Sequence, residues 1–131
     1  MADNLLSKYG LGKAPAEGQP GKTEYKPFEA SRSEPRPLLE VRWGRTGYSV
    51  DYKYLRNILF DFDKSPEEMT LYMSMVRLTI YGRNLWELKD RLHSHAVHWL
   101  EPFDPDRHLE PAPGIATIEE ITVHELEARE A

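Results

Sequence analysis

Apolar and polar residues alternate through the middle of the chain, and this pattern restricts the fold to one built mainly from strands. A period of two places alternate side chains on opposite faces of a sheet. Leu39, Val41 and Trp43 alternate with charged residues, and the same spacing returns after the Gly44-Arg45-Thr46-Gly47 turn. Residues 38–54 are therefore predicted to form a β-hairpin.

Three later segments repeat the alternation. Residues 58–62 form a further predicted strand, and Pro66 separates it from the next segment because proline cannot donate to a strand ladder. Residues 69–80 are predicted to form a second hairpin with a tight turn. After a proline- and glycine-rich loop, residues 118–123 suggest a last strand, either at an edge or in the centre of the sheet.

The spacing changes to that of a helix after Gly82. One apolar stripe follows at intervals of three and four, and it predicts a helix near residues 84–97. Asn84 and Glu87 match a capping box, and Glu87 and Arg91 are spaced for an ion pair on the outer face. The predicted fold is α+β, an antiparallel sheet of about five or six strands with one helix packed on one face. The stripe consists of Leu85, Leu88, Leu92 and Ala96.

The N-terminal segment differs in composition from the rest of the chain. Residues 1–37 hold half of the ten prolines and half of the eight glycines, so they are predicted to form a flexible arm. A single α+β domain is predicted over residues 38–125, and residues 126–131 are predicted to form a frayed acidic tail. The arm contains a short apolar segment that either docks on a partner or is incidental to its composition. That segment consists of Leu5, Leu6, Tyr9 and Leu11.

Composition and charge exclude several classes of function. The 131 residues include no cysteine, which rules out disulfides, thiolate metal sites and a cysteine nucleophile and fits a cytoplasmic location. Neither a secretory signal nor an apolar stretch long enough for membrane insertion is recognised. The net charge is −5, and residues 1–37 are slightly basic, so the domain is acidic. An acidic domain is a poor partner for a nucleic acid.

The sheet face opposite the helix is the main candidate surface. Arg42, Arg77 and Tyr81 are predicted to lie on it, since they alternate with the residues assigned to the core. Arginine and tyrosine are common at protein interfaces, which favours a protein partner. Together with Lys53, the same residues could instead bind single-stranded nucleic acid.

Gly82, Arg83 and Asn84 are a candidate anion site. They lie at a predicted strand-to-helix junction, where free backbone N–H groups and the helix dipole favour an anion. The alternative is a simple turn in which Asn84 caps the helix and Arg83 pairs with a nearby acid. A single glycine is not a phosphate loop, and the second interpretation is favoured.

Catalytic and metal sites have little support in the sequence. Asp61 and Asp63 form a D-x-D pattern, but aspartate is also common in turns. Positions two apart on a helix point about 200° apart, so His93 and His95 cannot share one ion. His95 and His98 could, but no supporting carboxylate lies on their face. No catalytic residue, metal ligand or cofactor is predicted. A small metal-dependent enzyme using Asp61, Asp63 and a histidine is the weakest alternative.

Gly82, Arg83, Leu85 and Leu88 have the spacing G-R-x-L-x-x-L, and Leu92, His95 and Val97 have the spacing L-x-x-H-x-V. On these motifs the chain resembles a group of small uncharacterised bacterial proteins. Their pattern combines a tyrosine-rich strand, a V-x-I-x-G-R-x-L-x-x-L run, an L-x-x-H-x-V run and a terminal strand. The resemblance covers roughly residues 48–123, while Arg77 and the proline-rich arm depart from it. No activity is known for the group, so the resemblance implies a common fold alone. The matching positions are Tyr52, Tyr54, Leu55, Val76, Leu78, Ile80, Gly82, Arg83, Leu85, Leu88, Leu92, His95 and Val97.

The function favoured by the sequence is that of a non-enzymatic accessory protein. It is predicted to bind a protein partner through the arm segment and the outer sheet face. The single-stranded nucleic-acid module is the alternative. The sequence identifies neither the partner nor the oligomeric state.

Overall fold

The computed structural model describes residues 21–32 and 34–126. The chain divides into two compact units, and the smaller one contains residues 21–25 and 104–112 of the described chain. In this unit Thr23 and His108 form a parallel bridge, and the rings of Tyr25 and His108 meet edge-on with centroids 5.0 Å apart. The larger unit contains the two sheets and the helix described next.

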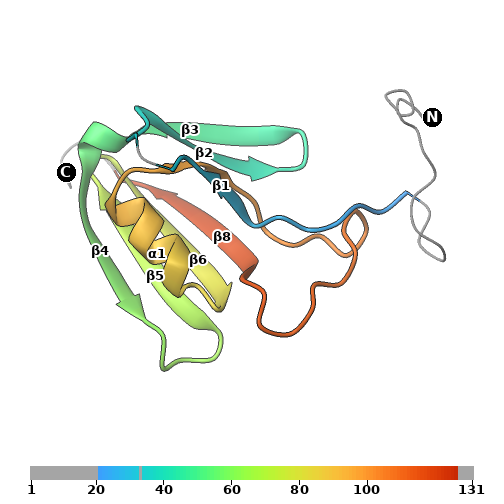
Figure 1. The fold of residues 1–131 in the computed structure, drawn as a ribbon. Coiled ribbons are helices and arrows are strands. Elements are labelled where there is room, and N and C mark those ends of the chain that lie inside the picture. The colour runs from blue at the N-terminus through green and yellow to red at the C-terminus, as the bar shows by residue number, and fades with distance from the viewer. Residues whose placement is uncertain (1–20, 33, 127–131) are drawn as a thin grey trace. The chain divides into compact units, whose positions relative to one another are not determined.

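The described residues of the larger unit form two four-stranded sheets and one α-helix (Figure 1). The first sheet has the strand order β1-β7-β2-β3, and the second has the order β4-β5-β6-β8. The elements are β1 (Phe28–Ala30), β2 (Leu38–Trp43), β3 (Thr46–Asp51), the 3-10 helix η1 (Tyr52–Tyr54), β4 (Leu55–Asp61), β5 (Glu67–Met73), β6 (Val76–Arg83), α1 (Trp86–His93), β7 (Val97–Leu100) and β8 (Thr117–Glu125).

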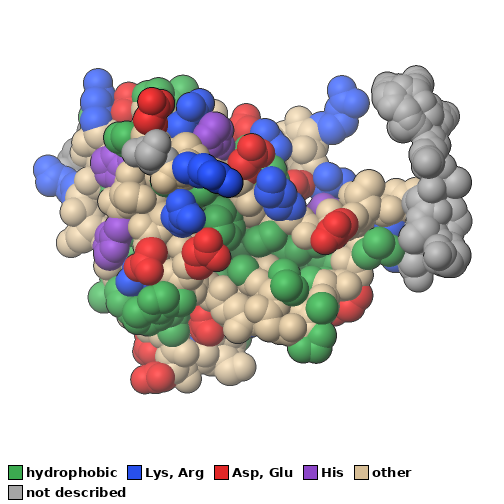
Figure 2. Space-filling model, in the orientation of Figure 1, with side chains coloured by type: hydrophobic (Ala, Val, Ile, Leu, Met, Phe, Trp, Pro, Cys, Tyr) green, Lys and Arg blue, Asp and Glu red, His purple; other side chains and the backbone are tan. Residues whose placement is uncertain are grey.

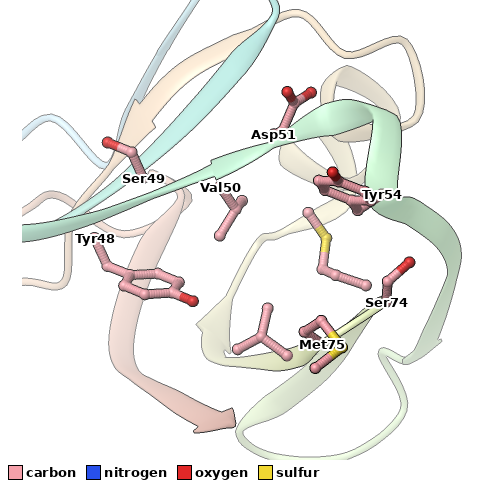
Figure 3. Close-up of a pocket in the computed structure, with 9 residues that line it drawn as sticks. Tyr48, Ser49, Val50, Asp51, Tyr54, Ser74 and Met75 are labelled. Atoms are coloured by element: carbon pink, nitrogen blue, oxygen red, sulfur yellow. The ribbon is translucent and has the colours of Figure 1, made fainter. Parts of the chain in front are cut away.

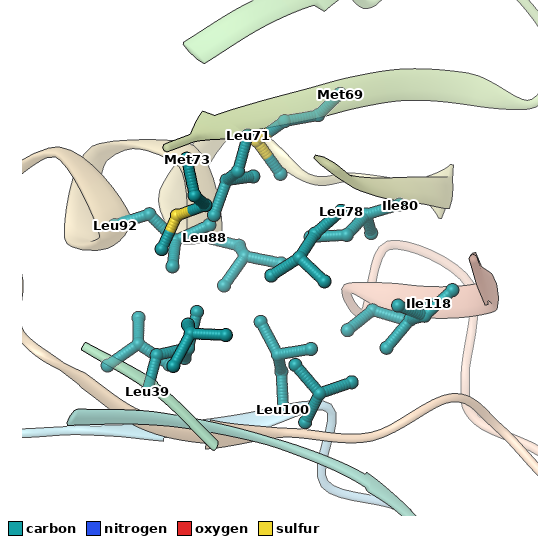
Figure 4. Close-up of a cluster of buried hydrophobic side chains, with 14 of the residues drawn as sticks. Leu39, Met69, Leu71, Met73, Leu78, Ile80, Leu88, Leu92, Leu100 and Ile118 are labelled. Atoms are coloured by element: carbon teal, nitrogen blue, oxygen red, sulfur yellow. The ribbon is translucent and has the colours of Figure 1, made fainter. Parts of the chain in front are cut away.

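A single hydrophobic core lies between the two sheets and α1 (Figure 4). Leu39 and Leu100 enter it from the first sheet, and Leu71 and Ile80 enter it from the second. Leu88 of α1 is fully buried in the same cluster. Alternation thus determines which side chains face inward, as the sequence indicated.

The prediction of one sheet was wrong, although the strands and the helix give the broad α+β class that the sequence indicated. Alternation marks the buried face of a strand but does not say which strand it pairs with. Both predicted hairpins form, as β2–β3 and β5–β6, and they lie in different sheets. The last strand, β8, pairs antiparallel with β6 and ends its sheet.

Two details of the predicted strands need correction. Tyr52 and Tyr54 are not in a strand, because the chain leaves β3 at Asp51 and forms the turn η1. The Asp51 side chain accepts a hydrogen bond from the Lys53 N–H at 3.0 Å, which is the usual capping contact of such a turn. Phe62 likewise follows the end of β4 and lies in the turn before β5.

Helix α1 is shorter than the predicted 84–97 and begins without the predicted cap. Asn84 has a left-handed φ of 58°, and Leu85 occupies the N-cap position with no side-chain cap. The prediction of a capping box formed by Asn84 and Glu87 is therefore wrong. A carboxylate oxygen of Glu67, on β5, accepts a hydrogen bond from the Leu85 N–H at 2.9 Å. The predicted ion pair of Glu87 and Arg91 is present at 3.8 Å.

The helix ends in a left-handed turn made by a histidine. His95 has a φ of 60°, and its N–H donates to the Leu92 carbonyl at 3.0 Å. The Ala96 N–H donates to the Arg91 carbonyl at 2.9 Å, which completes a Schellman motif. Residues 97–100 then form β7 between β1 and β2, a strand that the sequence did not predict.

The ordered domain also begins earlier than residue 38. Strand β1, inside the predicted arm, pairs antiparallel with β7 and places Phe28 opposite Leu100. The Arg36 N–H donates to the His95 carbonyl at 2.7 Å, which attaches the segment before β2 to the end of the helix. The apolar arm residues Leu5, Leu6, Tyr9 and Leu11 lie outside the described residues, and so does most of the predicted tail.

Candidate functional site

An apolar groove lies beside β3, the last strand of the first sheet (Figure 3). Its volume is about 520 Å³. Four consecutive residues of β3, from Tyr48 to Asp51, line one side, so the edge of the strand borders the groove as well as its inner face. The other lining residues are Tyr54, Met73, Ser74, Met75 and Val76.

Local sequence explains how the groove is built. The period of two in β3 turns Tyr48 and Val50 toward the second sheet and Ser49 and Asp51 away from it, as Figure 3 shows. The opposite wall is the two-residue turn between β5 and β6, which places Met75 at the mouth of the groove. Because this turn and β3 belong to different sheets, the groove lies at an open end of the core.

The chemistry of the groove is that of a binding surface. Its exposed lining is mainly apolar. Among the described residues that line it, the only carboxylate is that of Asp51, which accepts the Lys53 N–H and lies 4.0 Å from the Lys53 ammonium. Within residues 21–32 and 34–126, β3 pairs with β2 alone. Alternate residues of an edge strand turn their N–H and C=O groups outward, so this edge offers backbone groups to another chain.

The structure separates the residues that the sequence placed on one outer face. Arg42 lies on the outer face of the first sheet, whereas Arg77 and Tyr81 lie on the outer face of the second. The two sheets bury their inner faces against each other, so these surfaces point in opposite directions. The prediction of one shared face was wrong because it assumed one sheet.

Each of these residues has close neighbours on its own face. The Arg42 guanidinium lies 4.4 Å from the Trp99 ring centroid, and its Nε donates to Glu40 at 2.7 Å. Arg77 lies 5.5 Å from the Tyr72 ring centroid. Across the strands, Tyr81 lies between Glu68 and Glu120 in the register. Acidic residues thus adjoin the surface proposed for nucleic acid, while Lys53 lies elsewhere, on η1.

The predicted anion site at Gly82, Arg83 and Asn84 does not form a cradle of free N–H groups. Gly82 is a buried strand residue, and Arg83 lies 3.8 Å from Glu119. The Leu85 N–H, at the beginning of the helix, already donates to the Glu67 carboxylate. The protein therefore supplies its own anion at this position. Asn84 instead donates its side-chain amide to the Ile115 carbonyl at 3.3 Å.

Removing this carboxylate should weaken the attachment of α1 to β5. The Glu67→Ala variant is expected to lower the free energy of unfolding by about 1 kcal/mol, the usual cost of losing an N-terminal cap. Chemical denaturation monitored by circular dichroism measures it. Glu68→Ala is the matched control, since Glu68 forms a surface ion pair with Lys64 at 2.9 Å and should cost less than about 0.5 kcal/mol. Equal losses in both variants would contradict the capping role.

The candidate metal ligands are not brought together. No group of three or more histidine, aspartate or glutamate residues within the described chain is arranged to hold an ion. A carboxylate oxygen of Asp61 accepts the Asp63 N–H at 3.1 Å. This contact is typical of an aspartate that forms a turn, which is the alternative to a metal site for the D-x-D pattern. His95 stacks on Tyr52 with ring centroids 4.6 Å apart, while His93 is exposed.

Sequence reasoning missed Tyr54 and Met75, the exposed large hydrophobic side chains among the described residues that line the groove. The sequence pattern predicts a strand at Tyr54 and places Met75 in the tight turn of the second hairpin. One signal was available, because an apolar residue at a turn that is usually polar is a feature of binding surfaces.

No helix among the described residues has the length and apolar character needed to cross a membrane.

The described part of the chain is thus mainly β, with two sheets, one α-helix and an apolar groove at a sheet edge. Searches against protein-family models, curated proteins and solved structures find no match for the chain. The resemblance to small bacterial proteins stays a prediction.

Proposed function

We propose that this chain is a non-enzymatic accessory protein that binds an extended apolar segment of a protein partner in the groove beside β3. The observation that carries the proposal is the combination of a strand edge and an apolar wall along four consecutive residues. A segment placed there can pair its backbone with β3 while alternate side chains enter the groove. Met73 and Met75 suit such a ligand, because unbranched thioether side chains adapt to different shapes.

The surfaces predicted from the sequence enter this proposal in different ways. A segment added at β3 extends the first sheet, so its outward side chains continue the face that carries Arg42 and Trp99. The arm residues Leu5, Leu6, Tyr9 and Leu11 are proposed as a second contact with the same partner. Arg77 and Tyr81 lie on the outer face of the second sheet, and their contact with a partner stays a prediction. The neighbouring glutamates give no support to the nucleic-acid alternative.

Selection from a displayed library of random ten-residue peptides tests the groove. Peptides that bind the full chain are expected to be apolar at alternate positions. Met75→Glu should weaken their binding at least about tenfold, since it places a charge in the apolar mouth. Leu38→Glu is the control, because Leu38 is 51% exposed, close to the 49% of Met75, but lies on the outer face of β2. Titration of labelled peptides measures both variants.

Amide hydrogen exchange distinguishes strand addition from simple apolar contact. Bound peptide should slow exchange at alternate residues of β3, whose N–H groups face the open edge. Selected peptides that bind Met75→Glu as tightly as the unmodified chain, or a library that yields no binders, would rule out the groove. Deleting residues 1–20 tests the arm separately, by whether a partner captured from the native host is lost.

A further inference from the structure

Strand β4 is a second open edge, at the end of the other sheet. Within the described residues it pairs with β5 alone. Five of its seven residues are exposed, and Leu59, next to the central residue, is 64% exposed. The charged residues Arg56 and Asp61 lie toward its ends, and the strand contains neither lysine nor proline, which protect many sheet edges. An exposed edge strand with apolar residues near its centre is a template for another strand.

Aromatic side chains extend this apolar surface. The ring centroids of Phe60 and Phe62 lie 5.8 Å and 5.6 Å from that of Trp86, at the beginning of α1. The Lys89 ammonium lies 4.3 Å from the Trp86 centroid and pairs with Asp90, so the indole covers a buried lysine. Trp86 itself remains 57% exposed. Figure 2 shows hydrophobic side chains gathered over the end of β4 and the beginning of α1.

We propose that β4 pairs antiparallel with β4 of a second copy of this chain, around a twofold axis that passes through Leu59. The pairing joins two four-stranded sheets into one continuous sheet. It also covers the most exposed large apolar side chain of the described surface. The partner is a second copy because the strand is complementary to itself, as the register shows.

A twofold axis perpendicular to the sheet keeps the inner faces of both copies on the same side. An axis at Leu59 then sets Leu59 against the partner's Leu59, Ile58 against the partner's Phe60, and Asn57 against the partner's Asp61. Apolar residues meet apolar residues on both faces, and an amide meets a carboxylate.

The neighbouring registers are less favourable. An axis at Ile58 places Asn57 against the partner's Leu59, and an axis at Phe60 places Leu59 against the partner's Asp61. Each sets a polar side chain against an exposed leucine, so the apolar contact at Leu59 and the contact of the Asn57 amide with the partner's Asp61 are both lost. The axis at Leu59 is therefore the register that the side chains select.

Cysteine cross-linking tests this register, because the sequence contains no cysteine of its own. Opposed Cα atoms in antiparallel strands lie about 4.5–5.5 Å apart, within the range that a disulfide spans. Leu59→Cys should therefore form a disulfide-linked dimer on mild oxidation. The two copies of Asn57→Cys, on the same strand and face, are offset by four residues, about 14 Å, and should not link.

A mixture of two variants makes the test specific. Asn57→Cys and Asp61→Cys should link to each other when mixed, although neither links to itself, because the proposed register sets these positions opposite each other. Non-reducing gel electrophoresis followed by mass spectrometry reads the products. Linking of Asn57→Cys to itself as fast as Leu59→Cys would overturn the register.

Sedimentation equilibrium tests the dimer without cross-linking. A short strand pair predicts a reversible dimer with a dissociation constant on the order of 100 µM. Leu59→Lys should weaken it at least about tenfold, whereas Leu38→Lys, equally apolar and exposed on the other sheet, should leave it unchanged. A monomer for the unmodified chain up to about 500 µM overturns the proposal. Met75→Glu should not affect the dimer, so the failure of either proposed interface is seen separately.

Discussion

The Gly82→Ala variant is expected to lose about 3 kcal/mol or more of its free energy of unfolding. A β-carbon at this position would lie 2.1 Å from the carbonyl oxygen of Thr117, which is a backbone atom of the adjacent strand. The register between β6 and β8 shifts between Tyr81 and Gly82, and the two backbones approach each other there. Backbone atoms cannot move aside as a flexible side chain can, so the pair of strands must separate.

Urea denaturation followed by tryptophan fluorescence measures this loss. Gly114→Ala is the matched control, because Gly114 has a φ of +91° but no atom within 4 Å of an added β-carbon. It should lose only the backbone strain of about 1 kcal/mol. If Gly82→Ala is no less stable than Gly114→Ala, the close approach of β6 and β8 is incorrect.

The sequence predicted the hairpins well because their determinants are local. In β2 and β3 the alternation of Leu39 and Val41 with charged residues specifies one buried face, and the intervening turn fixes the register. The same applies to β5 and β6. Residues that make a hairpin lie within a few positions of each other, so a reading along the chain finds them.

The pairing of β7 depends on distant residues and could not be predicted. Its parallel partner β2 and its antiparallel partner β1 both precede it by more than fifty residues. The end of the helix was missed for a different reason. The left-handed position is usually glycine, and here it is His95, which gives no stop signal in the sequence.

The candidate site likewise depends partly on local sequence and partly on distant residues. Period-two spacing in β3 places Val50 on the inner face, but the groove also needs Met75, which comes from the turn between β5 and β6. Glu67 caps α1 from eighteen positions away, so the local Asn84 pattern was misleading. A motif search along the chain finds neither, because both depend on how the two sheets pack.

Tyr52 is the residue through which η1 is fixed to the junction of α1 and β7. Its side chain is 2% exposed, its hydroxyl donates to the Val97 carbonyl at 2.9 Å, and its ring stacks on His95. Tyr52→Ala is expected to cost about 3–5 kcal/mol, since it removes a large buried ring. Tyr52→Phe keeps the ring and should cost about 1–2 kcal/mol for the lost hydrogen bond. Tyr54→Phe, in the same turn but 48% exposed, is the control and should be nearly neutral.

The pH dependence of the free energy of unfolding, compared between the unmodified chain and Tyr52→Phe, tests whether the Tyr52 hydroxyl is buried. Burial raises the pKa of Tyr52 well above its ordinary value of 10.0, and the hydrogen bond to Val97 opposes this only in part. The unfolded chain therefore releases this proton at a lower pH than the folded chain does, so its contribution to stability is complete below pH 10 and declines above it. The stability gap between the unmodified chain and Tyr52→Phe should narrow above that pH by up to about 1.4 kcal/mol per unit. Denaturation curves at several pH values measure the gap, and a constant difference would show that the Tyr52 hydroxyl is not buried.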